Sequence, residues 1–93
     1  MFLARDATIA LMPKRPRHRV VLYSRPGCHL CDVARETILA QRERQGFEFE
    51  EVDIEADEDL ELEYGIRIPV VEVDGEEAFE VTVDAARLAA LVG

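Results

Sequence analysis

The first half of the chain contains a short apolar run followed by a longer segment with helical spacing. Residues 19–24 (RVVLYS) are apolar and β-branched, which predicts a buried strand. Residues 25–27 (RPG) predict a turn. From His29 to Gln45 the spacing is helical and ends at Gly46, a residue suited to the left-handed position after a helix. Its expected core face is Leu30, Ala34, Ile38 and Gln41, with Val33 beside it, and its solvent face is Arg35, Glu36, Arg42, Glu43 and Arg44.

The second half contains three further strands, the last two joined by a turn, and two shorter helices. Residues 47–54 alternate apolar and acidic, as in a strand, and residues 56–64 predict a short acidic helix ended by Gly65. Its inward residues are expected to be Leu60 and either Leu62 or Tyr64. Residues 68–73 and 76–81 predict strands joined by Asp74-Gly75, a strong hairpin signal. Thr82 or Asp84 is expected to cap a last helix with core residues Ala85, Leu88, Leu91 and Val92.

These elements give the order β-α-β-α-β-β-α, without repeats. A helix between the first two strands makes them parallel, and the two-residue turn makes the last two antiparallel. We therefore predict an α/β fold with a central four-stranded mixed sheet flanked by helices.

The length of 93 residues fits one domain. Pro13 and Pro16 discourage regular structure near the start, so residues 1–17 are expected to be a flexible N-terminal tail and residues 18–93 the folded domain. No apolar run is long enough to cross a membrane, and the first residues lack a signal-peptide pattern. We expect a cytoplasmic monomer with no membrane contact.

The net charge of −9 is unevenly distributed. Ten of the 20 acidic residues lie between Glu48 and Glu63 with no basic residue among them. A short basic run, residues 14–19, precedes the first strand, but it is interrupted by proline and contains no aromatic residue. The acidity argues against a nucleic-acid partner. The acidic segment is interpreted as a solvated face, with selection of a partner as the alternative.

The chemistry of the chain centres on its only two cysteines, Cys28 and Cys31. A bridge between them closes too small a loop to staple the fold. Cys28 falls where a strand leads into a helix, so free N–H groups and the helix dipole stabilise its thiolate. Arg25 and His29 add positive charge nearby, although His29 is equally well explained as an exposed spacer. Cys31, one turn along, can reach the Cys28 sulfur, which predicts thiol–disulfide exchange.

Two other interpretations of the cysteine pair remain open. The spacing also suits half of a metal site, but the only other histidine, His18, precedes the first strand. A four-coordinate metal site needs two more ligands than this cysteine pair supplies. Two chains that share a metal or an iron–sulfur cluster would supply them. A non-catalytic interaction module that keeps the fold is the other alternative.

Ile68-Pro69 is a second unusual feature, because proline cannot donate a hydrogen bond within a central strand. A cis peptide bond in a tight turn accounts for it. The alternative is a proline at the head of an edge strand.

Together these residues resemble the thioredoxin superfamily, and more closely its glutaredoxin-like branch. The resemblance is carried by VVLYSRPGCHLC (residues 20–31), the helix after it, and YGIRIPVVEVDG (residues 64–75). It covers nearly everything after the tail. It implies a thioredoxin-like fold and a redox-active Cys28–Cys31 disulfide used in electron transfer.

The resemblance also assigns roles to individual residues. Cys28 matches the nucleophile of the family, Cys31 its resolving thiol and Pro69 its cis-proline. Arg25 falls where glutaredoxins usually carry a lysine, and the backbone of Ile68 would pair with the bound thiol substrate. With His29 these residues form the expected catalytic and substrate-binding set.

The chain departs from glutaredoxins at two places. It has His29-Leu30 where they have Pro-Tyr, and Phe79-Glu80 where they have the glycines that hold glutathione. From the Cys28–Cys31 pair and the resemblance we expect a thiol–disulfide oxidoreductase that reduces protein or small-molecule disulfides, with no resident cofactor. Glutathione and a thioredoxin reductase-like protein are the candidate reductants.

Overall fold

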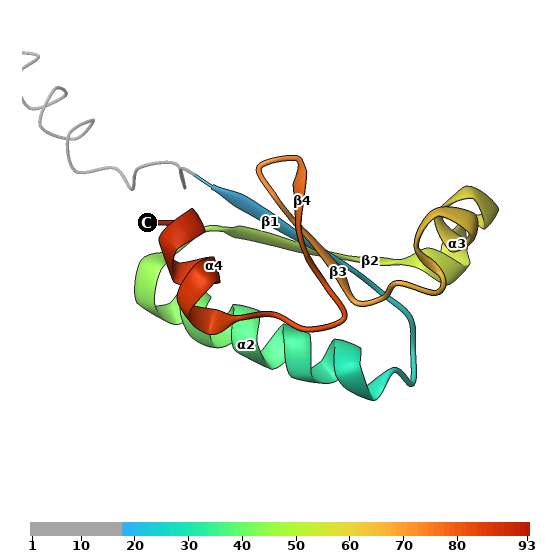
Figure 1. Ribbon diagram of the computed structural model, residues 1–93, viewed down its shortest axis with the longest axis horizontal. Helices are drawn as coiled ribbons and strands as arrows, with labels where there is room; N and C mark the ends of the chain where they lie inside the picture. The colour runs from blue at the N-terminus through green and yellow to red at the C-terminus, as the bar shows by residue number, and fades with distance from the viewer. Residues whose placement is uncertain (1–17) are drawn as a thin grey trace, which may run out of the picture.

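The computed structural model describes residues 18–93, and Figure 1 shows a sheet with helices against it. The predicted flexible tail, residues 1–17, lies outside the described residues. The element order confirms the predicted one, with a 3-10 turn (η1) added between the second strand and the second helix. The elements are β1 (Arg19–Ser24), α2 (His29–Gln45), β2 (Glu48–Asp53), η1 (Ile54–Ala56), α3 (Glu58–Tyr64), β3 (Val70–Val73), β4 (Glu76–Glu80) and α4 (Ala85–Leu91).

The sheet has the order β2-β1-β3-β4. β1 and β2 are parallel because α2 carries the chain back between them, and the other two pairs are antiparallel. In the β3–β4 hairpin, Asp74 has φ 54° and Gly75 has φ 86°, the two positive values of a tight primed turn. The predicted mixed sheet is confirmed.

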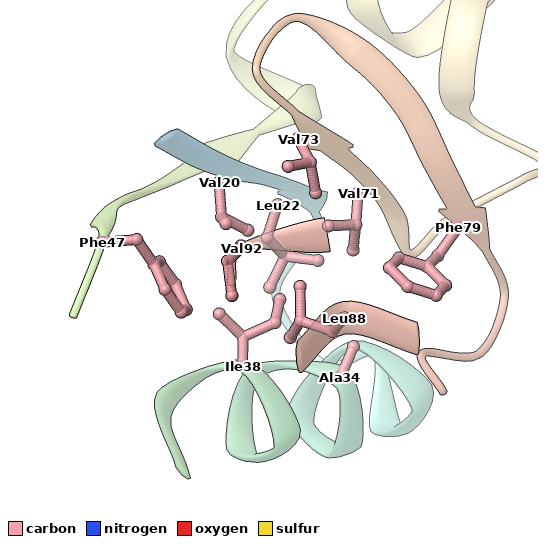
Figure 2. Close-up of a cluster of buried hydrophobic side chains, with 10 residues drawn as sticks. All are labelled: Val20, Leu22, Ala34, Ile38, Phe47, Val71, Val73, Phe79, Leu88 and Val92. Atoms are coloured by element: carbon pink, nitrogen blue, oxygen red, sulfur yellow. The ribbon is translucent and has the colours of Figure 1, made fainter. Parts of the chain in front are cut away.

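One face of the sheet packs against α2 and α4 and contains the main core, drawn in Figure 2. Strand side chains above meet helix side chains below, and Phe47 and Phe79 lie at opposite ends of the cluster. Burial of this much apolar surface is the main stabilising contribution to the fold. The cluster contains Val20, Leu22, Ala34, Ile38, Phe47, Val71, Val73, Phe79, Leu88 and Val92.

The other face of the sheet has a smaller cluster next to α3. Ile54, Tyr64 and Val70 are buried in it. The rings of Tyr23 and Tyr64 stack with centroids 4.3 Å apart, and both hydroxyls donate to Glu72, at 3.3 and 3.4 Å. This face therefore mixes aromatic packing with a carboxylate.

The buried stripe of α2 differs from the predicted one. Cys31, Ala34 and Ile38 are buried, whereas Leu30 and Val33 are 45% and 46% exposed. A cysteine behaves as a small apolar residue, so Cys31 can occupy the core position at the start of this stripe. The prediction of Leu30 and Val33 at or beside the core face was therefore wrong, because the helix is rotated by about one residue.

The observed starts of α3 and β3 differ from the predicted ones. α3 begins at Glu58 because the Asp57 side chain accepts from the Asp59 N–H, and it turns Tyr64 inward while Leu62 is 86% exposed. β3 begins only after Pro69, which lacks an N–H.

Asp84, rather than Thr82, caps α4 by accepting from the N–H groups of Ala86 and Arg87. Leu88 and Val92 are buried as predicted, but Ala85 and Leu91 are exposed. The short helix thus presents a narrower apolar stripe than its sequence predicts.

Candidate active site

Cys28 caps the N-terminus of α2. Ser24 ends β1, a turn at Pro26-Gly27 reverses the chain with Gly27 at φ 80°, and Cys28 follows in an extended conformation (φ −91°, ψ 110°). Its Sγ accepts a hydrogen bond from the Cys31 N–H at 3.2 Å, and its carbonyl accepts the first helical bond from Asp32. The sulfur therefore takes the place of the oxygen of a serine or aspartate cap.

This position stabilises negative charge on the Cys28 sulfur. The Cys31 N–H points at the capping sulfur, and the positive end of the helix dipole lies at the same terminus. The Cys28 side chain is half-buried and therefore accessible from solvent. A nucleophilic thiolate needs both properties.

Cys31 differs from Cys28 in its burial. It is 0% exposed, and burial raises the pKa of its thiol to about 12, with the contact to Cys28 adding to this effect. The backbone N–H of Arg25 and the charge of Arg35 act in the opposite direction. The pair therefore consists of an accessible sulfur at the helix end and a protonated, buried one beside it.

Arg25 lies in the loop that precedes Cys28, but its charge is directed at the α3 side of the molecule. Its Nη2 donates to Glu61 Oε1 at 2.5 Å, and its Nε lies 3.9 Å from Glu55 Oε2. That Nε is buried and has no hydrogen-bond partner within the described residues. Its predicted role in substrate binding stays a prediction, as does that of His29, the exposed first residue of α2.

The Ile68-Pro69 peptide bond is cis. Because β3 lies between β1 and β4, the alternative of an edge-strand proline is wrong. Val70 is paired with Tyr23 near the end of β1, which places Pro69 at the end of the sheet from which the cysteine loop starts. The predicted contact of the Ile68 backbone with substrate is not tested by this geometry.

Val81, which the sequence analysis did not single out, lies against the cis-proline. Its N–H donates to the Pro69 carbonyl at 2.7 Å, and its φ is 73°. A β-branched residue rarely adopts positive φ. No local pattern in the sequence predicts this conformation.

A polar network next to the cysteine loop was also not predicted from the sequence. Arg35 holds Glu51 through Nε and Nη2, at 2.7 and 2.5 Å, and donates to Asp32 at 2.8 Å. The buried Ser24 hydroxyl donates to the same Glu51 at 2.6 Å. The guanidinium of Arg35 is the main reason why the pKa of Glu51 is lowered. The Asp32–Arg35 spacing was a visible signal, but the partner on β2 was not.

This network ties the first turns of α2 to the ends of β1 and β2. It borders an open cavity of about 410 Å³. The network fixes the position of the helix end that carries Cys28. The cavity is lined by Ser24, Arg25, Pro26, Gly27, Asp32, Arg35, Glu51 and Asp53.

His18 is bonded through Nδ1 to Asp74 at 2.6 Å, in the β3–β4 turn. Across residues 18–93, no three or more His, Cys, Asp or Glu side chains are grouped to hold a metal ion. In the same part of the chain, no helix is both long and apolar enough to span a membrane.

Proteins from several organisms have solved structures that are similar to this fold. One from X. campestris is 44% identical, with a TM-score of 0.63 over 76% of this chain and 91% of the other. One from Nitrosomonas europaea is 25% identical, with a TM-score of 0.74 over 89% of this chain and 100% of the other.

A thioredoxin from Halobacterium salinarum is 20% identical, with a TM-score of 0.61 over 99% of this chain and 81% of that one, which shows the fold. A comparison with curated proteins found no match. The sequence profile of the glutaredoxin-like domain (DUF836) matches residues 19–93. With a thioredoxin-like fold and a cysteine pair at the start of α2, the chain belongs to the glutaredoxin-like domain family (DUF836).

Proposed function

We propose that the protein is a thiol–disulfide oxidoreductase that reduces disulfides through Cys28 and Cys31. The observation that carries this proposal is the hydrogen bond from the Cys31 N–H to the Cys28 Sγ, which holds the two residues within one helical turn at the end of α2. The fold and the family are consistent with redox chemistry at this position.

In the first step the Cys28 thiolate attacks one sulfur of the substrate disulfide. A bond forms between Cys28 Sγ and that sulfur, the substrate S–S bond breaks, and the second substrate sulfur leaves as a thiolate that takes a proton from water. The helix end stabilises the attacking anion, which is why Cys28 rather than the buried Cys31 is the nucleophile.

In the second step Cys31 loses its proton and attacks Cys28 Sγ. The Cys28–Cys31 disulfide forms, and the first substrate sulfur leaves as a thiolate and is protonated. The substrate has then gained two electrons and two protons. A dithiol protein or two molecules of glutathione return the same number to the cysteine pair. This direction fits the expected cytoplasmic location, where thiols are kept reduced.

The test follows reduction of a small disulfide, bis(2-hydroxyethyl) disulfide, with glutathione or a thioredoxin reductase as electron donor. Replacement of Cys28 by serine is expected to abolish turnover. Replacement of Cys31 is expected to trap a mixed disulfide, seen as an added mass, or to leave a monothiol activity where glutathione resolves it. Circular dichroism controls for folding of both variants. Turnover that survives in the C28S protein contradicts the proposal.

The same preparation distinguishes the metal-carrier alternative. A colour, or a metal content of about one ion or cluster per two chains, that is lost with Cys28→Ser would favour a shared cofactor over redox exchange. A colourless, metal-free protein that turns over disulfides supports the oxidoreductase.

A further inference from the structure

Leu62 and Ile66 are the most exposed large apolar side chains among the described residues. Leu62 on α3 is 86% exposed, and Ile66, in the turn after α3, is 100% exposed. Their near neighbours Leu60 and Tyr64 turn toward the sheet. The segment therefore uses one side for packing and presents two apolar side chains on the other, where folding gains nothing from them.

Carboxylates surround this apolar pair. α3 and the turns on either side of it carry six of them and contain no lysine. The two nearby guanidinium groups pair with members of this set: Arg25 with Glu61 and Glu55, and Arg67 with Glu63 at 3.5 Å, in addition to Glu77 at 2.9 and 3.1 Å. Six carboxylates against two guanidinium groups leave this segment with an excess of negative charge. The surface is therefore apolar at its centre and negative around it. The six carboxylates are Glu55, Asp57, Glu58, Asp59, Glu61 and Glu63.

This surface adjoins the cysteine loop. Arg25, whose Nη2 donates to Glu61 on α3, is the residue three positions before Cys28. The backbone of Gly65, after α3, also lies close to this nitrogen, because a Cβ atom at Gly65 would be 3.5 Å from it. Ile66 precedes Pro69 by three residues. Figure 1 shows α3 and the loop from β1 to α2 at the same end of the molecule. A polypeptide bound on α3 and the turn after it would therefore lie at the end of the molecule that carries Cys28.

We propose that Leu62, Ile66 and the surrounding carboxylates form a docking surface for a polypeptide substrate whose disulfide is flanked by apolar and basic residues. Apolar side chains of the substrate cover Leu62 and Ile66, and its lysines or arginines meet the carboxylates. Charge complementarity of this kind raises the rate of encounter and disfavours acidic partners. The inference rests on the proposed oxidoreductase function, because the docked segment is positioned for attack by Cys28.

The test uses the full chain and three substrates: bis(2-hydroxyethyl) disulfide and two synthetic disulfide peptides of equal length. One peptide has leucine and lysine beside the disulfide, and the other has leucine and glutamate. We expect kcat/KM for the lysine peptide to exceed that for the glutamate peptide by about tenfold at low salt. The advantage is expected to shrink at high ionic strength, because salt screens exposed charges.

Two variants locate the effect. The double variant Leu62→Ser, Ile66→Ser is expected to lower kcat/KM for the lysine peptide by about fivefold or more, with the small disulfide unchanged within about twofold. The matched control is Leu91→Ser, which changes an apolar residue on α4 that is 37% exposed. Figure 1 shows α4 at the end of the molecule away from α3. It is expected to leave the ratio of the two peptide rates unchanged.

The outcomes separate the two proposals. If the small disulfide is not reduced at all, the oxidoreductase function itself fails. If it is reduced but the two peptides react equally, or the double variant keeps the full lysine-peptide rate, the docking surface is refuted. A fall of several degrees in the melting temperature of the double variant also refutes it, because it would mean that other residues of this chain, such as residues 1–17, already cover the pair.

Discussion

The sheet face that packs against α2 and α4 buries ten side chains in one cluster, whereas the face beside α3 buries three. The first face is almost wholly apolar at its centre, with one polar network, around Glu51, at the end near the cysteines. The second has two tyrosine hydroxyls on Glu72 and leaves Leu62 and Ile66 exposed. The first face therefore carries most of the stability. The second can change its surface at little cost to folding.

Matched leucine truncations give the largest difference between the two faces. Leu88→Ala, in the α2–α4 core, is expected to lower the free energy of unfolding by about 2–5 kcal/mol, because a fully buried side chain leaves a cavity. Leu60→Ala on α3 removes a half-buried side chain and is expected to cost about 1 kcal/mol. Urea denaturation measures both, with the exposed Leu62→Ala as a control that stays within about 0.5 kcal/mol. Equal losses at Leu88 and Leu60 would contradict the comparison.

The glutamate of the first face gives a smaller effect that depends on pH. Arg35 lowers the pKa of Glu51 in the folded protein, so this carboxylate stabilises the fold fully above its ordinary pKa. That contribution is lost as the pH falls through the lower, folded value. Glu51→Gln is expected to cost about 1 kcal/mol at neutral pH, because the bonded pair is only partly exposed.

The difference between Glu51→Gln and the unaltered protein should shrink as the pH is lowered from about 5 to about 3. Urea midpoints at several pH values measure it. Glu77→Gln, which removes an exposed partner of Arg67 on the other side of the molecule, is the control and is expected to change the midpoint less. A difference that stays constant down to the lowest pH would show that Arg35 does not stabilise the Glu51 charge.

The two tyrosines report on the second face alone, because the chain contains no others. Burial raises the pKa of both Tyr23 and Tyr64, and the nearby charge of Glu72 adds to it. An ordinary tyrosine is half ionised at about pH 10. At that pH the phenolate absorbance of the folded protein is expected to stay well below half of its final value.

The stability contributed by the neutral phenols is present below about pH 10 and is lost at higher pH, as the folded groups ionise. Urea-unfolded protein provides the reference curve with ordinary ionisation. Coincident curves for folded and unfolded protein would mean that the tyrosine pair is not packed beside Glu72.

Val81 gives the smallest expected effect. Its φ of 73° is unfavourable for a β-branched residue, and glycine adopts this region freely. Val81→Gly is expected to raise the free energy of unfolding by about 0.5 kcal/mol, since the strain relieved exceeds the entropy that glycine loses on folding. Thermal denaturation measures it, with the exposed Val33→Gly, inside α2, as a control that should be destabilised by about 1 kcal/mol. Destabilisation at both positions would contradict the assignment of strain to Val81.

The sequence determined the elements and the place of the cysteine pair. β1 and α2 begin and end where their patterns predict, because a β-branched run and a capped helix are local properties. The Asp74-Gly75 turn, the β-α-β-α-β-β-α order and the position of Cys28 at the start of α2 were predicted for the same reason.

Only the tertiary structure decided which side of each helix is buried and which distant groups meet. Leu30 and Leu91 are apolar but exposed, because packing selects one rotation of a helix and the apolar pattern permits several. The bonds from Arg25 to Glu61 and from Arg35 to Glu51 join residues 36 and 16 positions apart. Local spacing contains no information about such pairs. They exist because the sheet and the α2 crossover bring those segments together.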